Sequence, residues 1–229
     1  MTWYADSNSP VAEEAPVKAG AALLRYYDER LATYGDTPQG AGWPNVADRL
    51  TRFTVLLEIV DHLSPPGHVT LCDLACGTGE LLRVVQAQAR TNIGYLGVDL
   101  SDHALAMARS KYPQGVFHHI DALTAPQEKM ELLRCDVLVA NGLFTVKGKL
   151  SDAEMWEFMT ATLRRIWPFV GHGIVFNLMS PVVDWRRDDL FHVSYDALAA
   201  FLQGLAGRRI GFRADYGLYE HMAFARKHP

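Results

Sequence analysis

The chain has 229 residues, of which 49% are hydrophobic and 21% charged, so it is long enough for one globular domain with a sizeable core. Its formal net charge of −4 and its scattered arginine pairs argue against a nucleic acid as partner. The longest uncharged run, residues 166–183, is interrupted by proline and glycine, which argues against a membrane-spanning helix. The N-terminus lacks a signal-peptide pattern and the cysteines lack paired spacing, so we expect a cytoplasmic protein with reduced thiols.

The first 67 residues are predicted to form a helical segment ahead of any strand. Residues 1–18 are polar and are expected to be flexible. Apolar residues recur at helical spacing from Ala19 onward, and this helix is predicted to end in a loop rich in glycine and proline that carries Trp43. A second helix is predicted over residues 46–63, because Pro65-Pro66-Gly67 follows it. The two helices, within residues 19–67, precede the sheet of a single domain, 19–229.

A strand, a glycine turn and a helix follow each other over residues 69–89. The turn holds Gly77 and Gly79, and such a turn lets backbone N–H groups and a helix N-terminus approach a nucleotide. A dinucleotide fingerprint requires a third small residue, but Leu82 stands there. Asp73 at the strand end would repel phosphate and attract a cation. Asp99, about 20 residues further on, suits a ribose diol. The pattern therefore favours S-adenosylmethionine over a phosphorylated cofactor.

Further strands and helices alternate to the end of the chain. Because strands that alternate with helices form a parallel sheet covered on both faces, we predict a doubly wound α/β fold, with residues 208–226 as a hairpin. The predicted helices after the turn are 102–111, 151–166 and 195–204, and the predicted strands are 69–74, 95–99, 116–120, 135–140, 173–178, 208–214 and 219–226.

Four segments in order resemble motifs of one enzyme family. They are Asp73-Leu74-Ala75-Cys76-Gly77-Thr78-Gly79, Asp99, Ile120-Asp121-Ala122 and the run from Asp136 to Asn141. On these the chain resembles a class I S-adenosylmethionine-dependent methyltransferase of the small-molecule branch, from Val69 to the C-terminus. Ala75 departs from the commonest glycine there but is also small.

The resemblance implies a Rossmann-like core over 68–229, in which a mainly parallel sheet of seven strands ends in an antiparallel edge hairpin. It also implies S-adenosylmethionine as cofactor. The resemblance further implies that residues 19–67 form a cap or lid that closes over the cofactor. We expect Trp43 of its loop to contact the cofactor and Arg52 to reach a carboxylate of the cofactor or of the substrate, although loop packing and a solvated helix face are the alternatives. The other expected cofactor-binding residues are Asp73, Ala75, Gly77, Gly79, Asp99, Leu100, Asp121, Ala122 and Asn141.

The residues after the fourth core strand exclude some acceptor classes. Asn141 is not followed by the Pro-Pro pair of methylases that act on amino groups of DNA bases. Neutral Asn141 and cationic Lys147 argue against Mg²⁺-dependent catechol-type methylation. His118 and His119 are adjacent on a strand and point to opposite faces, so they cannot share a metal ion. No metal site is predicted.

The loop after the fifth core strand, residues 179–195, mixes aromatic and charged side chains. His192 has a suitable pKa for a general base toward a hydroxyl acceptor, and Asp184 is the candidate to orient it. A histidine with no catalytic role is the alternative. We place the acceptor between the N-terminal helices and this loop, facing Asn141.

The function predicted from the sequence is methyl transfer to a small molecule, a sugar or natural-product intermediate, at oxygen. Two alternatives stay open: a non-catalytic S-adenosylmethionine-binding regulatory subunit, and a nicotinamide-dependent oxidoreductase. The oligomeric state is also open, and a homodimer is compatible with the sequence. No nucleic-acid or membrane partner is expected.

Overall fold

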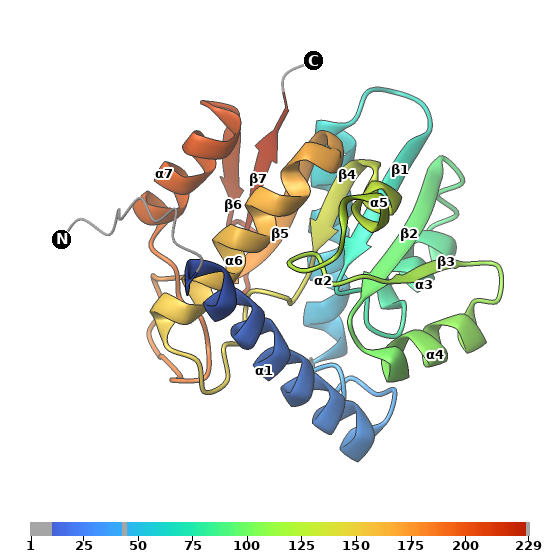
Figure 1. Cartoon of the computed structure of the whole chain (residues 1–229). Coiled ribbons are helices and arrows are strands. Elements are labelled where there is room, and N and C mark those ends of the chain that lie inside the picture. Colours follow the sequence, from blue (N-terminus) through green and yellow to red (C-terminus); the bar gives the residue numbers. More distant parts are fainter. Residues whose placement is uncertain (1–10, 43–44, 228–229) are drawn as a thin grey trace.

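The computed structural model describes residues 11–42 and 45–227 and contains one seven-stranded sheet in the order β3-β2-β1-β4-β5-β7-β6 (Figure 1). Neighbours among β1 to β5 pair in parallel, whereas β7 is antiparallel to β5 and to β6. This confirms the predicted fold class, including the antiparallel hairpin at one edge. The strands are β1 (Val69–Leu74), β2 (Ile93–Asp99), β3 (Val116–His119), β4 (Cys135–Ala140), β5 (Val170–Met179), β6 (Ile210–Arg213) and β7 (Glu220–Arg226).

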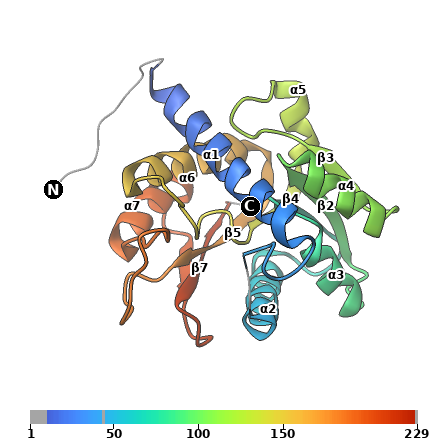
Figure 2. The same ribbon diagram turned by 90° about the horizontal axis from the view of Figure 1, so that it is seen from below.

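Helices cover both faces of the sheet. Figure 2 shows α6 and α7 on one side and α2 and α3 on the other, while α1 lies along the edge where the parallel strands end. The helices are α1 (Val11–Tyr34), α2 (Val46–Leu63), α3 (Glu80–Ala87), α4 (Asp102–Lys111), α5 (Gln127–Met130), α6 (Asp152–Ile166) and α7 (Tyr195–Ala206), with short 3₁₀ turns at Glu131–Leu133 and Trp167–Phe169.

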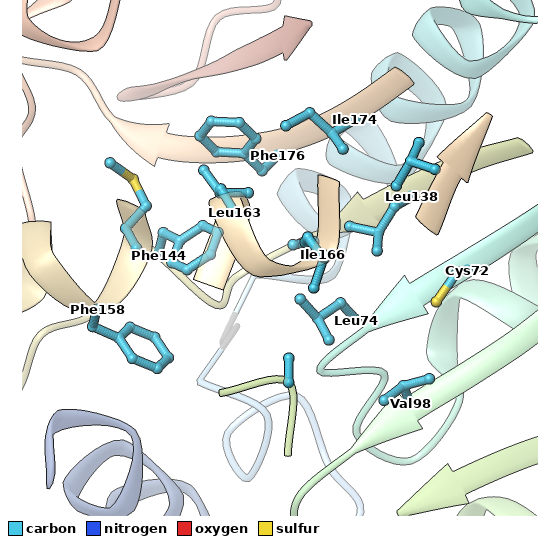
Figure 3. Close-up of a cluster of buried hydrophobic side chains, with 14 of the residues drawn as sticks. Cys72, Leu74, Val98, Leu138, Phe144, Phe158, Leu163, Ile166, Ile174 and Phe176 are labelled. Carbon is cyan, nitrogen blue, oxygen red and sulfur yellow. The ribbon is translucent and has the colours of Figure 1, made fainter. Parts of the chain in front are cut away.

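Alternate residues of the central strands enter two separate cores, because successive side chains of a strand point to opposite faces. Cys72 and Leu74 of β1 pack with Leu138 of β4 beneath α6, as the close-up in Figure 3 shows. Leu71 and Val137 pack instead with the apolar face of α2. With both faces buried, the strands read as continuous apolar runs and fix the sheet in the middle of the domain.

Local signals set several boundaries as predicted. The strands β1 and β4 and the helix α4 have the predicted bounds. The side chain of Ser151 accepts a hydrogen bond from the Glu154 N–H and the Glu154 carboxylate accepts one from Ser151, which is the predicted capping box of α6. Asn45 caps α2 with a side-chain acceptor alone, since its Oδ1 accepts hydrogen bonds from the N–H groups of Ala47 and Asp48.

The first helix begins earlier than predicted. The sequence predicts flexible residues to 18 and a helix from Ala19, but α1 starts at Val11 and contains Pro16. A proline in the second turn removes only a hydrogen bond near the helix end, and the residues around it are good helix formers. Residues 1–10 lie outside the described part of the chain. No helix of the described residues is long and apolar enough to cross a membrane.

Candidate functional site

A cavity of about 460 Å³ lies between the carboxyl ends of β1, β2 and β4 and the segment formed by α1, α2 and their connecting loop. This is where ligands bind in open α/β sheets, and the volume is in the range of small-molecule sites. Leu23, Tyr27 and Leu31 of α1 form the wall that faces the strand ends. Eight predicted cofactor residues line this main cavity: Asp73, Ala75, Gly77, Asp99, Leu100, Asp121, Ala122 and Asn141.

The two glycines of the turn have different roles. Both have positive φ, +55° at Gly77 and +83° at Gly79. Gly77 lines the cavity, and a Cβ built on it would meet no protein atom within 4 Å. The space beside Gly77 is therefore open. A Cβ at Gly79 would lie 3.0 Å from the Tyr112 ring, so Gly79 is required for packing and does not line the cavity. Ala75 has φ +60°, which is strained for a residue with a Cβ.

Asp99 joins the turn to the end of β2. Its Oδ2 accepts a 2.7 Å hydrogen bond from the Gly77 N–H, and its Oδ1 accepts one of 2.8 Å from the Ser101 N–H. Burial raises the pKa of this carboxyl, and the backbone hydrogen bonds oppose that rise. Each carboxylate oxygen can accept a further hydrogen bond from a ligand in the cavity.

Asp73 is buried at the end of β1. Its Oδ2 accepts a 2.7 Å hydrogen bond from the Tyr95 hydroxyl. Burial raises the pKa of Asp73 to about 7, the Tyr95 hydrogen bond lowers it in part, and the nearby Asp99 charge adds to the rise. The free energy of a buried carboxylate falls when a cation binds beside it.

Two further residues reach the cavity from β3 and β4. The Asp121 carboxylate accepts hydrogen bonds of 2.8 Å from the Leu123 N–H and from the Thr124 hydroxyl, so it stabilises its own turn and presents Ala122 to the cavity. Asn141 follows β4, and its Oδ1 is buried without a hydrogen-bond partner. Buried oxygens without a partner are costly, so Asn141 is suited to accept a hydrogen bond from a ligand.

Polar contacts join the cap to the core on either side of the main cavity. Thr78 of the turn donates a 2.6 Å hydrogen bond to Asp36, which follows α1, and Lys111 Nζ lies 2.7 Å from the same carboxylate. Ser101 donates to Asp28 of α1. Arg49 of α2 forms an ion pair with Glu80 at the start of α3, at 3.1 Å. The cap is therefore attached to the glycine turn, to β2 and to α3.

A second cavity, of about 200 Å³, adjoins the main one. Tyr27 and Ala41 line both, and the Tyr27 hydroxyl lies 3.3 Å from the Gly142 carbonyl oxygen, to which it donates. The second cavity lies between α1, α2 and the segment after β5. Its other walls include Tyr26, Asp48, Arg52, Thr145, Met179, Trp185, Arg187, Leu190 and Glu220.

A buried hydrogen-bond network connects the two cavities. Arg52 Nε donates a 2.7 Å bond to Glu220, whose side chain is 1% exposed. The Asn177 amide donates to the other Glu220 oxygen at 3.3 Å and accepts a 2.7 Å bond from the Gly142 N–H. Glu220 therefore fixes the orientation of Asn177, which holds the loop that carries Asn141.

Comparison with known proteins identifies the fold and the reaction. A family model described as a methyltransferase domain matches residues 72–166, which include the glycine turn, Asp99 and Asn141. The chain is 29% identical over 173 residues to "Putative methyltransferase Rv1506c" of Mycobacterium tuberculosis, a match covering 75% of this chain and 99% of that protein. Residues 72–166 therefore match a methyltransferase domain, and the sheet that contains them has the fold of S-adenosylmethionine-dependent methyltransferases.

Solved structures share its fold at low sequence identity. The magnesium protoporphyrin IX methyltransferase ChlM of Synechocystis, crystallised with S-adenosylmethionine, matches with a TM-score of 0.58 and 13% identity over the whole of both chains. The plantazolicin methyltransferase BpumL, in complex with a pentazolic substrate analogue and S-adenosylhomocysteine, matches with a TM-score of 0.64 and 13% identity over 95% of this chain and 98% of that one. At this identity the likeness establishes the fold alone.

The main cavity of the methyltransferase fits S-adenosylmethionine as cofactor. Gly77 leaves a space that a Cβ would fill, and Asn141 presents an oxygen without a partner. Buried Asp73 and half-buried Asp99 would repel a pyrophosphate and attract an ammonium or sulfonium.

Three predicted residues of the methyltransferase lie away from the main cavity. Arg52 lines the second cavity and pairs with Glu220, which differs from the prediction that it reaches the cofactor. His192 is half-buried, and its Nδ1 lies 2.7 Å from the Ser180 carbonyl oxygen. Asp184 is exposed, and no hydrogen bond joins it to His192 among the described residues. Trp43 lies outside the described residues.

Sequence analysis missed Tyr27, Glu220 and Asn177. Tyr27 falls within the first predicted helix, where its spacing indicates only a packed helix face. Glu220 and Asn177 are brought together by the pairing of β5 with β7, which no local pattern shows. No group of three or more potential metal ligands occurs among the described residues. His118 is half-buried and His119 exposed, the latter 3.3 Å from Asp102.

Proposed function

We propose that this methyltransferase transfers a methyl group to a hydroxyl oxygen of a small molecule, a sugar or natural-product intermediate, bound in the second cavity. The observation that carries the proposal is the shared wall of the two cavities at Tyr27 and Ala41. A cofactor in one cavity and an acceptor in the other would meet there. This space lies between the N-terminal helices and the segment after β5, where sequence analysis placed the acceptor.

The cofactor contacts proposed follow from the walls of the main cavity. Asp99 accepts hydrogen bonds from the ribose hydroxyls, and the segment at Ala122 contacts the adenine. Asp73 and the free Oδ1 of Asn141 attract the ammonium. Gly77 brings the backbone close to the thioether end, because its missing side chain leaves that space open.

The chain's contribution to the reaction is alignment, exclusion of water and proton transfer. S-adenosylmethionine supplies a methyl group on a sulfonium, and positive charge disappears in the in-line displacement. Tyr27 and the Gly142 loop hold the acceptor hydroxyl opposite the methyl group, which accounts for much of the rate through orientation. The hydroxyl proton passes to a protein base as the new C–O bond forms and the C–S bond breaks.

Glu220 is the base that the cavity walls favour. It lines the second cavity, and burial raises the pKa of its carboxyl while Arg52 and Asn177 oppose that rise. His192 is the alternative. Its Nδ1–H donates to the Ser180 carbonyl. The lone pair of Nε2 is then the proton acceptor, and Nε2 is buried without a hydrogen-bond partner. Trp185, a wall residue of the second cavity, has its ring 6.5 Å from that of His192.

The nature of the walls supports a small acceptor without strong net charge. Tyr26, Tyr27 and Trp185 supply aromatic surface, and Arg187 is neutralised by Asp189 at 2.5 Å. ChlM and BpumL, which share the fold, are named for a tetrapyrrole and for plantazolicin, so this fold accepts compounds of that kind. The net charge of −4 gives no support to a nucleic-acid substrate.

Labelled cofactor tests the proposal directly. The protein is incubated with methyl-tritiated S-adenosylmethionine and a panel of phenols and sugars, each paired with its O-methyl ether, its amine analogue and its deoxy analogue. We expect label to appear only with hydroxyl-bearing members. Mass spectrometry of each labelled product locates the methyl group, and a methyl group on nitrogen or carbon would overturn oxygen as the target. Binding of cofactor without turnover on any member would favour a regulatory subunit.

A further inference from the structure

The charged residues around the main cavity are divided between two regions. Asp28, Asp73, Asp99 and Asp121 lie near the strand ends, and among the described lining residues no lysine, arginine or histidine accompanies them there. The cations Arg49, Arg83 and Lys111 lie near the start of α3 and the end of α4, together with Asp36 and Glu80. A zwitterionic amino-acid group needs a cation for its carboxylate, so the second region is where that carboxylate is recognised.

Two of the three cations are already fully engaged. Both Nε and Nη2 of Arg83 lie 2.7 Å from the Glu80 carboxylate, and this side chain is 43% exposed. Lys111 Nζ lies 2.7 Å from Asp36 and 3.0 Å from the Thr78 hydroxyl. Neither presents a buried donor to the cavity.

Arg49 differs from both. One of its terminal nitrogens pairs with Glu80 at 3.1 Å, but its Nε is buried and has no hydrogen-bond partner. The side chain is only 14% exposed, so water does not replace the missing acceptor at Nε. The nitrogen that pairs with Glu80 is Nη2, and Nε beside it is a directed, charged donor that can donate to an oxygen of a ligand carboxylate while Nη2 stays on Glu80.

We propose that Arg49 binds the carboxylate of the amino-acid end of the cofactor. The inference rests on the cofactor placement proposed above. Arg49 thereby replaces Arg52, which lies one helical turn later in α2, as the arginine proposed to bind the cofactor. Because α2 also carries Arg52 in the second cavity, this helix contacts both ligands.

Calorimetry with two nucleosides separates this role from a structural one. S-adenosylhomocysteine carries the amino-acid group, whereas 5′-methylthioadenosine has the same adenosine and thioether without it. Arg49→Gln is expected to raise the dissociation constant of S-adenosylhomocysteine roughly 10- to 100-fold, because hydrogen bonds to a charged group contribute about 1.5–3 kcal/mol. Binding of 5′-methylthioadenosine stays within about twofold of the unmodified protein, since it offers no group to Arg49.

Two variants control the comparison. Arg83→Gln removes the other arginine on Glu80 and is expected to leave both affinities unchanged. Arg49→Lys keeps the charge but not the directed Nε donor, so S-adenosylhomocysteine affinity should lie between those of the unmodified protein and Arg49→Gln. Thermal unfolding of each variant shows that the fold is retained.

Three results overturn the proposal alone. The first is that Arg49→Gln lowers the affinity for both nucleosides equally, which would assign Arg49 a structural role in attaching the cap to Glu80. The second is that it lowers the affinity for neither. If the unmodified protein binds 5′-methylthioadenosine and S-adenosylhomocysteine equally well, the amino-acid end is not recognised at all. Failure of the unmodified protein to bind either nucleoside would instead overturn the proposed cofactor placement.

Discussion

The hydroxyl of Tyr95 in β2 donates a 2.7 Å hydrogen bond to the Asp73 carboxylate at the end of β1. The contact is diagonal across the two parallel strands, because Asp73 is registered with Gly97 and Tyr95 with Leu71. Asp73 is 4% exposed, and burial raises its pKa from 3.8 to about 7. The carboxyl therefore exchanges a proton near neutrality, and this has a measurable consequence for stability.

The free energy of unfolding of the ligand-free protein is expected to fall as the pH rises from about 4 to about 7. In this window the folded state keeps the Asp73 proton and the unfolded chain has lost it, so the folded state binds more protons. The contribution has a slope of up to about 1.4 kcal/mol per pH unit. Urea unfolding at several pH values measures it. Asp73→Asn should flatten the curve, and an unchanged slope in that variant would assign the effect to other groups.

Asp99→Ala is expected to raise the dissociation constant of S-adenosylhomocysteine at least about tenfold, because charge-assisted hydrogen bonds to the ribose contribute about 1.5–3 kcal/mol each. The same change removes the acceptors of the Gly77 and Ser101 N–H groups, so some loss of stability is also expected. Asp99→Asn keeps neutral acceptors and should lose less affinity. Calorimetry measures both, with the exposed Asp102→Asn as control. An unchanged dissociation constant in Asp99→Ala would show that this carboxylate does not hold the ribose.

Asp36→Ala is expected to raise the dissociation rate of S-adenosylhomocysteine up to about tenfold, with less effect on folding. Asp36 attaches the loop after α1 to Thr78 and Lys111, and exposed bonds of this kind contribute about 0.5–1.5 kcal/mol. Stopped-flow displacement measures the rate. Asp61→Ala removes a surface partner of Arg90 away from the cavities and should leave the rate unchanged. Equal rates in all three proteins would mean that the cap does not retain the ligand.

Glu220→Ala is expected to destabilise the fold by about 3–5 kcal/mol, because it leaves Arg52 and the Asn177 amide without their buried partner. Asp61→Ala removes an ion pair of which the carboxylate is 55% exposed, and should cost within about 1 kcal/mol. Denaturant unfolding gives both values. A cost for Glu220→Ala no larger than that of the surface pair would contradict the role assigned to this network.

The proton acceptor is tested by comparing Glu220→Gln with His192→Ala, using an acceptor found with the labelled cofactor. If Glu220 is the base, Glu220→Gln lowers turnover roughly 10²–10⁴-fold, while His192→Ala chiefly changes the Michaelis constant. Glutamine retains the size of the side chain, and cofactor binding should be preserved in both. The reverse pattern would assign the proton to His192, and full turnover in both variants would mean that positioning suffices.

The fold was predictable because its signals are local. The apolar runs of β1 and β4 and the capping box of α6 each lie within a few residues. The gathering of most predicted cofactor residues around one cavity was predictable for the same reason, since the turn from Asp73 to Gly79 and the acid at Asp99 are short local motifs. The start of α1 was not, because Pro16 indicates a break that the surrounding helix formers outweigh.

The acceptor side depends on contacts between distant segments. Arg52 was predicted in the role now proposed for Arg49, because helical spacing does not show which of two adjoining cavities each turn of α2 faces. Likewise the segment after β5 has no regular pattern, so the positions of Asp184 and His192 were not predictable. Glu220 gained its partners only through the pairing of β7 with β5.

The sheet order also constrains how the protein is made. β6 precedes β7 in the chain but lies outside it in the sheet, so β6 cannot join the sheet until β7 has been inserted beside β5. Glu220 is the first residue of β7. During synthesis the strands that border the main cavity are therefore complete before β7 emerges. The ion pair between Arg52 and Glu220, which lines the second cavity, forms only after β7 has paired with β5.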